Sequence, residues 1–228
     1  MSRSRFDRTA DRYAESARRR NWDDLVAWCE PRPDDLVLDV AGGTGALAAA
    51  LAGRVAEVTV SDVSEPMLAH VHAPARAVVA RAEQLPFPDG SFDLVACIRS
   101  LHHVDSPTRA LDEMARVLRP GGRIVIEDFL ADPDPDRARR WEEIERLRDH
   151  DHRRLLGAGE ARSRLLADGL TVDAEEQWVE RRDVVRWLAL ADTGGEAAKR
   201  VRELVGGPEF QITVARARFR RPVDDGAP

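Results

Sequence analysis

The nine residues from 37 to 45, Val-Leu-Asp-Val-Ala-Gly-Gly-Thr-Gly, constrain this chain more than any other segment. A hydrophobic strand runs directly into a glycine-rich turn, and an alanine-rich helical segment follows. Glycine permits a tight turn and a close approach of the backbone to a ligand. The helix behind it offers unpaired N–H groups and partial positive charge. The pattern predicts the opening of a doubly wound α/β fold with a nucleotide-type binding site.

The turn departs from the dinucleotide-binding fingerprint G-x-G-x-x-G. Gly43 and Gly45 match its first two glycines, but Ala48 stands where the third would fall. Asp39 lies in the strand just before the turn, where a carboxylate offers nothing to a pyrophosphate and can pair with an ammonium group. The alternative is a tight strand–helix turn that binds no ligand.

Composition indicates one domain with a sizeable core, since the chain has 228 residues, of which 43% are hydrophobic and 33% charged. A net charge of −6 favours neither nucleic acid nor a membrane surface as partner. The first twenty residues are basic, with Arg3 among them, but no apolar segment of a signal peptide follows. Cys29 and Cys97 are far apart, so we expect buried thiols and a cytoplasmic protein.

Apolar periodicity predicts a helix over 8–28, stopped by Pro31 and Pro33. Strands expected at 36–40, 57–61, 77–80, 92–98 and 123–129 alternate with helices, which is typical of a parallel sheet. Beyond residue 131 we expect helices over 136–148, 160–167, 183–190 and 196–205, strands over 171–180 and 211–219, and a frayed tail from 224 to 228. Ser64 and Ser106 are expected to cap helices.

Asp62 ends the second expected strand, 17 residues after Gly45. A carboxylate at this point can accept hydrogen bonds from ribose hydroxyls. Its alternative role is that of an acid at the start of the helix that Ser64 opens. Residues 82–87 follow the third strand, where backbone groups can meet an adenine edge.

These motifs together resemble the class I S-adenosylmethionine-dependent methyltransferases, within them the ubiquinone/menaquinone-methyltransferase-like group. Residues 38–45 are similar to motif I, 62–68 to the post-I motif, 82–93 to motif II and 116–122 to motif III. The resemblance implies a Rossmann-like seven-stranded sheet, mostly parallel with an antiparallel last strand. It also implies an N-terminal helical lid at 1–33, a cofactor-binding core at 34–130, and helices and final strands on the substrate side at 131–222.

The resemblance implies a role for each matching position. Asp39 would hold the methionine ammonium of S-adenosylmethionine, Asp62 would bind the ribose hydroxyls, and Met67 would pack on the adenine. The remaining cofactor contacts would come from Tyr13 of the N-terminal signature, Ala41, Gly43, Thr44 and Gly45 of the turn, Val63, Arg81 and Ala82 at the adenine side, and Ile98 beneath the sulfonium.

Two departures from the family pattern bear on the acceptor. His102-His103 stands where the quinone enzymes usually carry Arg-Asn, and Arg81 stands where many relatives carry Asp. We therefore expect a small-molecule acceptor, with a polyprenyl quinone as the alternative. A protein of this fold that binds the cofactor without methyl transfer is a second alternative. A nicotinamide dehydrogenase would need the glycine that Ala48 replaces.

Methyl transfer depends mainly on alignment and desolvation of the reactants. An oxygen or nitrogen nucleophile can also need a base, and histidine has a suitable pKa. His103 is the first candidate base and His152 the second, while Arg99 or Arg148 could anchor an anionic substrate. No cluster has metal-ligand spacing. The acceptor, the methylated atom and the oligomeric state are not encoded in any readable motif.

Overall fold

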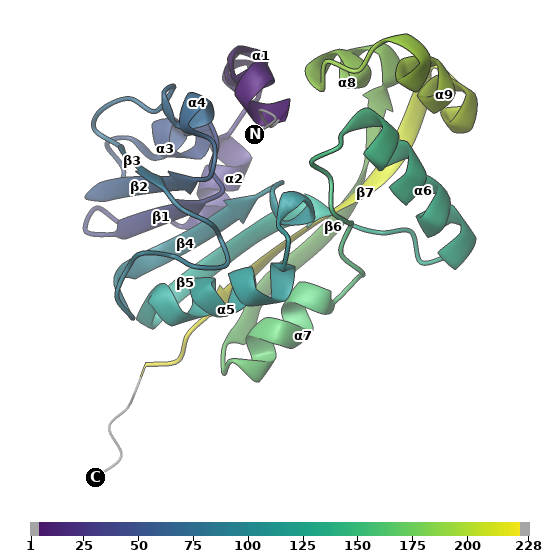
Figure 1. Cartoon of the computed structure of the whole chain (residues 1–228). Coiled ribbons are helices and arrows are strands. Elements are labelled where there is room, and N and C mark those ends of the chain that lie inside the picture. The colour runs from purple at the N-terminus through teal and green to yellow at the C-terminus, as the bar shows by residue number, and fades with distance from the viewer. Residues whose placement is uncertain (1–4, 224–228) are drawn as a thin grey trace.

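A seven-stranded sheet with helices on both faces forms the body of the computed structural model, which describes residues 5–223 (Figure 1). Its strand order is β3-β2-β1-β4-β5-β7-β6. Strand β7 runs antiparallel to both of its neighbours, and the other pairs are parallel. The prediction of a mostly parallel sheet with an antiparallel last strand is confirmed. The strands are β1 (Leu36–Val40), β2 (Glu57–Asp62), β3 (Arg76–Val79), β4 (Phe92–Ile98), β5 (Leu118–Phe129), β6 (Thr171–Asp183) and β7 (Glu209–Arg220).

The helices form two covering layers and a separate group beyond the sheet. Helices α5 and α7 cover one face, and α2 and α3 pack on the other. Helices α6, α8 and α9 gather around the far end of β7, while α1 lies near α4 and α8 (Figure 1). Their bounds are α1 (Arg5–Arg19), α2 (Asp23–Cys29), α3 (Ala46–Leu51), α4 (Glu65–Leu68), α5 (Pro107–Val117), α6 (Pro135–Arg148), α7 (Glu160–Ala167), α8 (Val184–Leu190) and α9 (Gly195–Val205), with a short 3₁₀ turn η1 (Leu101–His103).

Strand β1 is apolar on both faces because it lies between two hydrophobic cores. Leu38 and Val40 belong to the core under α5, whereas Val37 packs on the opposite side with the residues of α2 and α3. All three are at most 1% exposed. A central parallel strand is buried on both faces and therefore carries a nearly continuous hydrophobic run. The same burial fixes the carboxyl end of β1, and with it the glycine-rich turn.

The prediction of one helix over 8–28 is wrong. The structure has two helices, α1 and α2, and the chain turns between them. The Asn21 side-chain oxygen accepts a hydrogen bond from the Asp23 N–H at 2.8 Å, and the Trp22 indole donates to the Ala17 carbonyl at 2.9 Å. Asparagine competes with the helical backbone in this way and favours turns. The break separates α1 from α2 and lets α1 lie near α4 and α8.

Other boundaries moved for local reasons. Strand β5 begins at Leu118, five residues earlier than expected, because a register shift in its pairing with β4 accommodates the Pro-Gly-Gly segment. Ser64 caps α4 as expected, accepting from the Met67 N–H at 3.3 Å. Ser106 precedes α5, but its side chain makes no cap hydrogen bond. Arg3 and the expected tail at 224–228 lie outside the described residues.

A buried arginine joins β5 to the segment before β1. The Arg123 side chain is 1% exposed and donates to the Cys29 carbonyl at 2.7 Å, the Glu30 carbonyl at 2.8 Å and the Asp35 carboxylate at 2.5 Å. These hydrogen bonds hold the end of α2 and fix the entry into β1. No helix between residues 5 and 223 is both long and apolar enough to cross a membrane.

Candidate cofactor and acceptor site

A cavity of about 480 Å³ opens where β1, β2 and β4 end. Its wall includes the glycine-rich turn, the segments after β2, β3 and β4, the inner side of α1, and residues of α6 and α8. In open α/β sheets, ligands bind at the carboxyl ends of the strands where the strand order reverses, as it does here between β1 and β4. The volume is within the range of sites for small molecules and cofactors.

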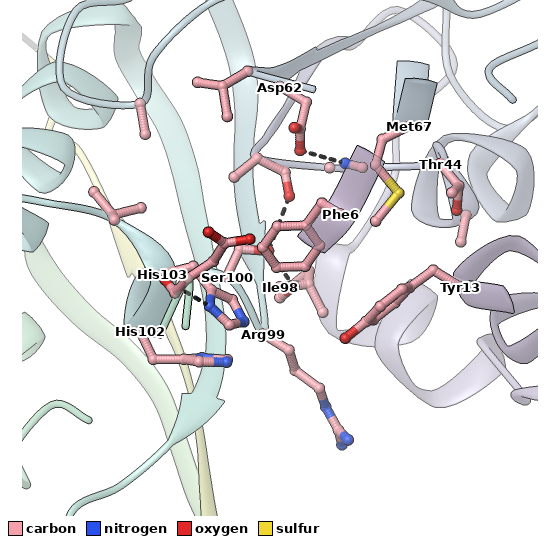
Figure 2. Close-up of a pocket in the computed structure, with 18 of the residues that line it drawn as sticks. Phe6, Tyr13, Thr44, Asp62, Met67, Ile98, Arg99, Ser100, His102 and His103 are labelled. Atoms are coloured by element: carbon pink, nitrogen blue, oxygen red, sulfur yellow. Dashed lines mark hydrogen bonds between the residues drawn. The ribbon is translucent and has the colours of Figure 1, made fainter. Parts of the chain in front are cut away.

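Asp62 braces the glycine-rich turn from the neighbouring strand. Its Oδ2 accepts from the Gly43 N–H at 2.9 Å (Figure 2), and its Oδ1 accepts from the Ser64 N–H at 2.9 Å. Gly43 has a φ of +55°, a conformation that glycine adopts without strain. Burial raises the pKa of the Asp62 carboxyl group. Each carboxylate oxygen retains a lone pair, so Asp62 can accept further hydrogen bonds from a ligand in the cavity.

Asp39 lies directly behind the turn. It is 2% exposed, and a Cβ atom added to Gly42 would fall 2.5 Å from its carboxyl group. Burial, followed by the charge of Asp62, raises the pKa of Asp39 to about 7. Two neighbouring carboxylates, one buried and one half-buried, favour a cation. The absent side chain at Gly42 leaves the space through which that cation could approach.

Most of the residues proposed from the sequence to bind a cofactor lie in the cavity wall. They are Tyr13, Ala41, Gly43, Thr44, Asp62, Val63, Met67, Arg81, Ala82 and Ile98. Asp39 and Gly45 lie behind it, Gly45 at the start of α3 with a φ of +72°. The Arg81 guanidinium turns to the Asp105 carboxylate at 2.6 Å.

Helix α1 covers the cavity through Phe6 and Tyr13. Figure 2 shows Phe6 between the side that carries Asp62 and Met67 and the side that carries the paired histidines. The Phe6 ring meets His103 edge to face, with centroids 4.8 Å apart. Arg5 forms a fully buried ion pair with Asp149 and donates to the Tyr13 hydroxyl at 2.6 Å.

Three histidine rings come together on the side of the cavity that lies across Phe6 from Asp62 (Figure 2). His102 and His103 line the wall with ring centroids 4.0 Å apart, and the His152 centroid is 5.9 Å from that of His102. His152 is buried behind the wall, where Nε2 contacts the Glu142 carboxylate at 3.1 Å. Burial lowers the pKa of His103 well below its usual value, and the positive charges of neighbouring groups add to this effect.

Sequence reasoning missed the partner of His102. The Asp128 Oδ1 atom lies 2.6 Å from His102 Nδ1, and Asp128 Oδ2 accepts from the His102 N–H at 3.1 Å. Asp128 is near the end of β5, which pairs with β4, and η1 follows β4. Because neighbouring parallel strands end at the same edge, the Glu-Asp pair at 127–128 was a signal that could have predicted this contact. An Asp–His pair of this kind fixes the tautomer and orientation of the ring.

Arginines dominate the wall farther from the glycine-rich turn. Arg99 directly follows β4 and has a φ of +55°, which is uncommon for a residue with a side chain. Its Nε donates to Glu127 at 2.6 Å, and it also pairs with Glu180 of β6. Arg20 donates to Glu127 at 2.7 Å. The cavity therefore has an acidic end at Asp39 and Asp62 and an arginine-rich end.

Comparison of this fold and sequence with known proteins identifies a class I methyltransferase. The family model "Methyltransferase domain" matches residues 38–126. The uncharacterized methyltransferase YcgJ of Bacillus subtilis is 29% identical over 207 residues, which are 86% of this chain and 82% of YcgJ. Its crystal structure superposes with a TM-score of 0.82 at 25% identity, covering 87% of this chain and 96% of that one.

The demethylmenaquinone methyltransferase of Clavibacter sepedonicus is 44% identical over 111 residues, 46% of this chain and 45% of that protein. The chain thus matches about half the length of this quinone relative. It belongs to the S-adenosylmethionine-dependent methyltransferases and is related to the ubiquinone/menaquinone C-methyltransferases. The chain is accordingly a methyltransferase enzyme.

Proposed function

We propose that this enzyme moves the methyl group of S-adenosylmethionine to a small organic acceptor inside the cavity under α1. The observation that carries the proposal is a pair of carboxylates, the buried Asp39 and the half-buried Asp62, on either side of a glycine turn that opens into the cavity. The raised pKa of Asp39 indicates that its ionised form lacks a compensating cation. The ammonium group of the cofactor would supply one.

The other residues of the site fit the rest of the cofactor. Asp62 would accept from the ribose hydroxyls while it braces Gly43, and Met67, which is 4% exposed, would pack on the adenine. Ala41, Thr44, Val63, Ala82 and Ile98 would complete the lining. When bound, the cofactor supplies a methyl group on a sulfonium, and a nucleophile can attack this methyl group in line with its bond to sulfur, which breaks. The protein's part is to align the two reactants and exclude water.

The acceptor would enter on the histidine side. His103 is the base expected from the sequence, and the structure adds His102 as a stronger candidate. Its Nδ1 faces Asp128, so the other ring nitrogen, Nε2, is free of that contact and can take a proton from the acceptor. The low pKa of His103 keeps that ring neutral, in keeping with its packing against Phe6. The buried position of His152 favours a structural role instead.

The three segments expected from the sequence would each have one of these tasks. Residues 1–33 would close the site, 34–130 would bind the cofactor, and 131–222 would shape the acceptor side. The two cysteines are free thiols buried in the structure, which fits the expected cytoplasmic location. Among the described residues, no group of histidine, cysteine and acidic side chains is arranged to hold a metal.

Calorimetry with S-adenosylmethionine and S-adenosylhomocysteine tests the cofactor assignment. Asp62→Ala should weaken binding by roughly 1–3 kcal/mol through lost hydrogen bonds. Glu65→Ala, three residues away on the exposed start of α4, serves as the matched control and should bind like wild type. An Asp62→Ala variant that binds equally well would remove the proposed ribose contact, and failure of the wild type to bind either compound would overturn the proposal.

Release of S-adenosylhomocysteine during incubation with candidate acceptors tests the transfer itself. With an acceptor that is turned over, His102→Gln should lower kcat at least tenfold without changing cofactor affinity. Asp128→Asn should shift the pH profile of kcat because it alters the group that orients His102. If His102→Gln retains full turnover while His103→Gln loses it, His103 is the base.

A further inference from the structure

The arginine-rich end of the cavity carries more positive than negative charge. Arg20, Arg99 and Arg182 line this part of the wall and surround two carboxylates, Glu127 and Glu180. Arg99 pairs with both acids, Arg20 with Glu127 at 2.7 Å, and Arg182 with Glu180 at 2.9 Å. Three guanidinium groups therefore share two carboxylates among the described residues.

A second layer of charges lies behind this part of the wall. Arg216 approaches Glu127 from behind at 2.9 Å and pairs with Asp24 at 2.7 Å and Glu176 at 3.3 Å, so the wider group holds four arginines and four acids. The Asp24 and Glu176 side chains contact Arg216 and are 75% and 42% exposed, so solvent screens them. Elsewhere in the wall, Arg148 pairs with Glu145 at 3.1 Å, and Arg81 contacts Glu83 and shares Asp105 with Arg153. The uneven pairing is therefore confined to the cavity-lining Arg20, Arg99 and Arg182 and their direct partners.

Burial of these unevenly paired arginines has an electrostatic cost. Burial lowers the pKa of the Arg20 and Arg182 guanidinium groups, and repulsion from Arg99 lowers both further. A buried cation with an incomplete counter-charge is stabilised by an anionic ligand. The opposite arrangement holds at the other end, where the buried Asp39 and the half-buried Asp62 favour a cation. The cavity is therefore polarised along its length.

Arg182 is the arginine best placed for an acceptor. Its guanidinium lies 4.4 Å from the centroid of Phe129, and Trp187 also lines this part of the cavity. Its strand, β6, is four strands away from β1 in the sheet order, whereas the glycine-rich turn follows β1 directly. Guanidinium binds carboxylate in a planar, two-point fashion. A guanidinium group with aromatic side chains beside it suits an organic acid with an apolar body.

We propose that the methyl acceptor is an organic carboxylate whose acid group binds Arg182 and whose apolar body packs against Phe129 and Trp187. This inference rests on the proposed function, because it assumes that the cofactor occupies the acidic end. The carboxylate would complete the charge balance of the arginine cluster. It would also hold the acceptor near His102, whose ring centroid lies 5.3 Å from that of Phe129.

The test uses whole protein saturated with S-adenosylhomocysteine, so that the cofactor's own carboxylate is already in place. Calorimetry then compares four acids, benzoate, phenylacetate, 4-hydroxybenzoate and indole-3-acetate, with their uncharged primary amides. We expect at least one acid to bind tenfold or more tightly than its amide, and we expect that preference to fall as salt is raised. Arg182→Gln should abolish the preference while S-adenosylhomocysteine still binds.

Arg181→Gln is the matched control, because Arg181 precedes Arg182 on β6, is exposed and is absent from the cavity wall. It should keep the preference, and Arg182→Lys should keep part of it. The inference is overturned if every acid binds no better than its amide, or if Arg182→Gln keeps the preference. It is also overturned if Arg182→Gln weakens S-adenosylhomocysteine instead, since Arg182 would then hold the cofactor's carboxylate. Failure of the wild type to bind S-adenosylhomocysteine would count against the proposed function itself.

Discussion

Replacing Asp39 with asparagine should make the ligand-free protein more stable at alkaline pH. The folded-state pKa of Asp39 is raised from about 3.8 to about 7, chiefly by burial. Between these values the folded protein keeps a proton on Asp39 that the unfolded chain has lost. The free energy of unfolding therefore falls as pH rises through this window, and the Asp39→Asn variant would not show the effect because its amide does not titrate.

The size of the effect follows from the width of the window. About three pH units at about 1.4 kcal/mol each give about 4 kcal/mol over the whole range. Between pH 5.5 and 8.5 only the portion below pH 7 contributes, which is about 2 kcal/mol. Urea denaturation of wild type and Asp39→Asn at these two pH values measures the difference, and Asp34→Asn, which removes an exposed acid nearby, is the control.

The same titration should appear in cofactor binding. A cationic ligand favours ionised Asp39, so wild-type affinity should rise with pH up to about 7 and binding should release a proton. Asp39→Asn should bind weakly, with no such pH dependence. If the stability difference between wild type and Asp39→Asn is the same at pH 5.5 and 8.5, Asp39 does not titrate near neutrality and the electrostatic reasoning fails.

Three further predictions concern packing and accessibility. Gly42→Ala should reduce cofactor affinity at least tenfold in calorimetry, because its Cβ would fall 2.5 Å from the Asp39 carboxyl group. If the variant bound as tightly as wild type, the turn would be able to shift and accommodate the added methyl group. Arg123→Met should lower the free energy of unfolding by about 3–5 kcal/mol by leaving Asp35 buried without its partner, whereas loss of an exposed ion pair costs less than about 1 kcal/mol. The Cys29 thiol, with its pKa raised to about 12 mainly by burial, should resist a thiol reagent at pH 8 until the protein unfolds; rapid labelling of folded protein would contradict this.

Local sequence patterns predicted the fold around the glycine-rich turn well. The run from Leu38 to Gly45 and the acid at Asp62 encode strand ends, turn and charge within one β–α–β unit, so their geometry depends on near neighbours. The parallel core strands were equally readable from their apolar runs. The break between α1 and α2 was missed because Asn21 and Trp22 end a helix through side-chain hydrogen bonds that periodicity does not reveal.

The part of the cavity lined by histidines and arginines could not be predicted in the same way. The contact between His102 and Asp128 joins residues 26 positions apart, and that between Arg99 and Glu180 joins residues 81 apart. Each depends on which strands become neighbours, and β6 and β7 enter the sheet in reversed sequence order. The sequence suggested Arg99 as an anchor, but only the packing shows that Arg99 is already paired and that Arg182 completes the cluster.

The position of α1 makes completion of the cavity wait for much later parts of the chain. Arg5 leaves the ribosome long before its carboxylate partner Asp149, and Arg12 of the same helix pairs with Asp192, 180 residues later. At about 5–20 residues per second, the helix waits on the order of 10 s or longer for these partners. The glycine-rich turn and its strands can form during that interval. We therefore expect a nascent chain to form β1, β2 and β4 before α1 covers the cavity at their ends.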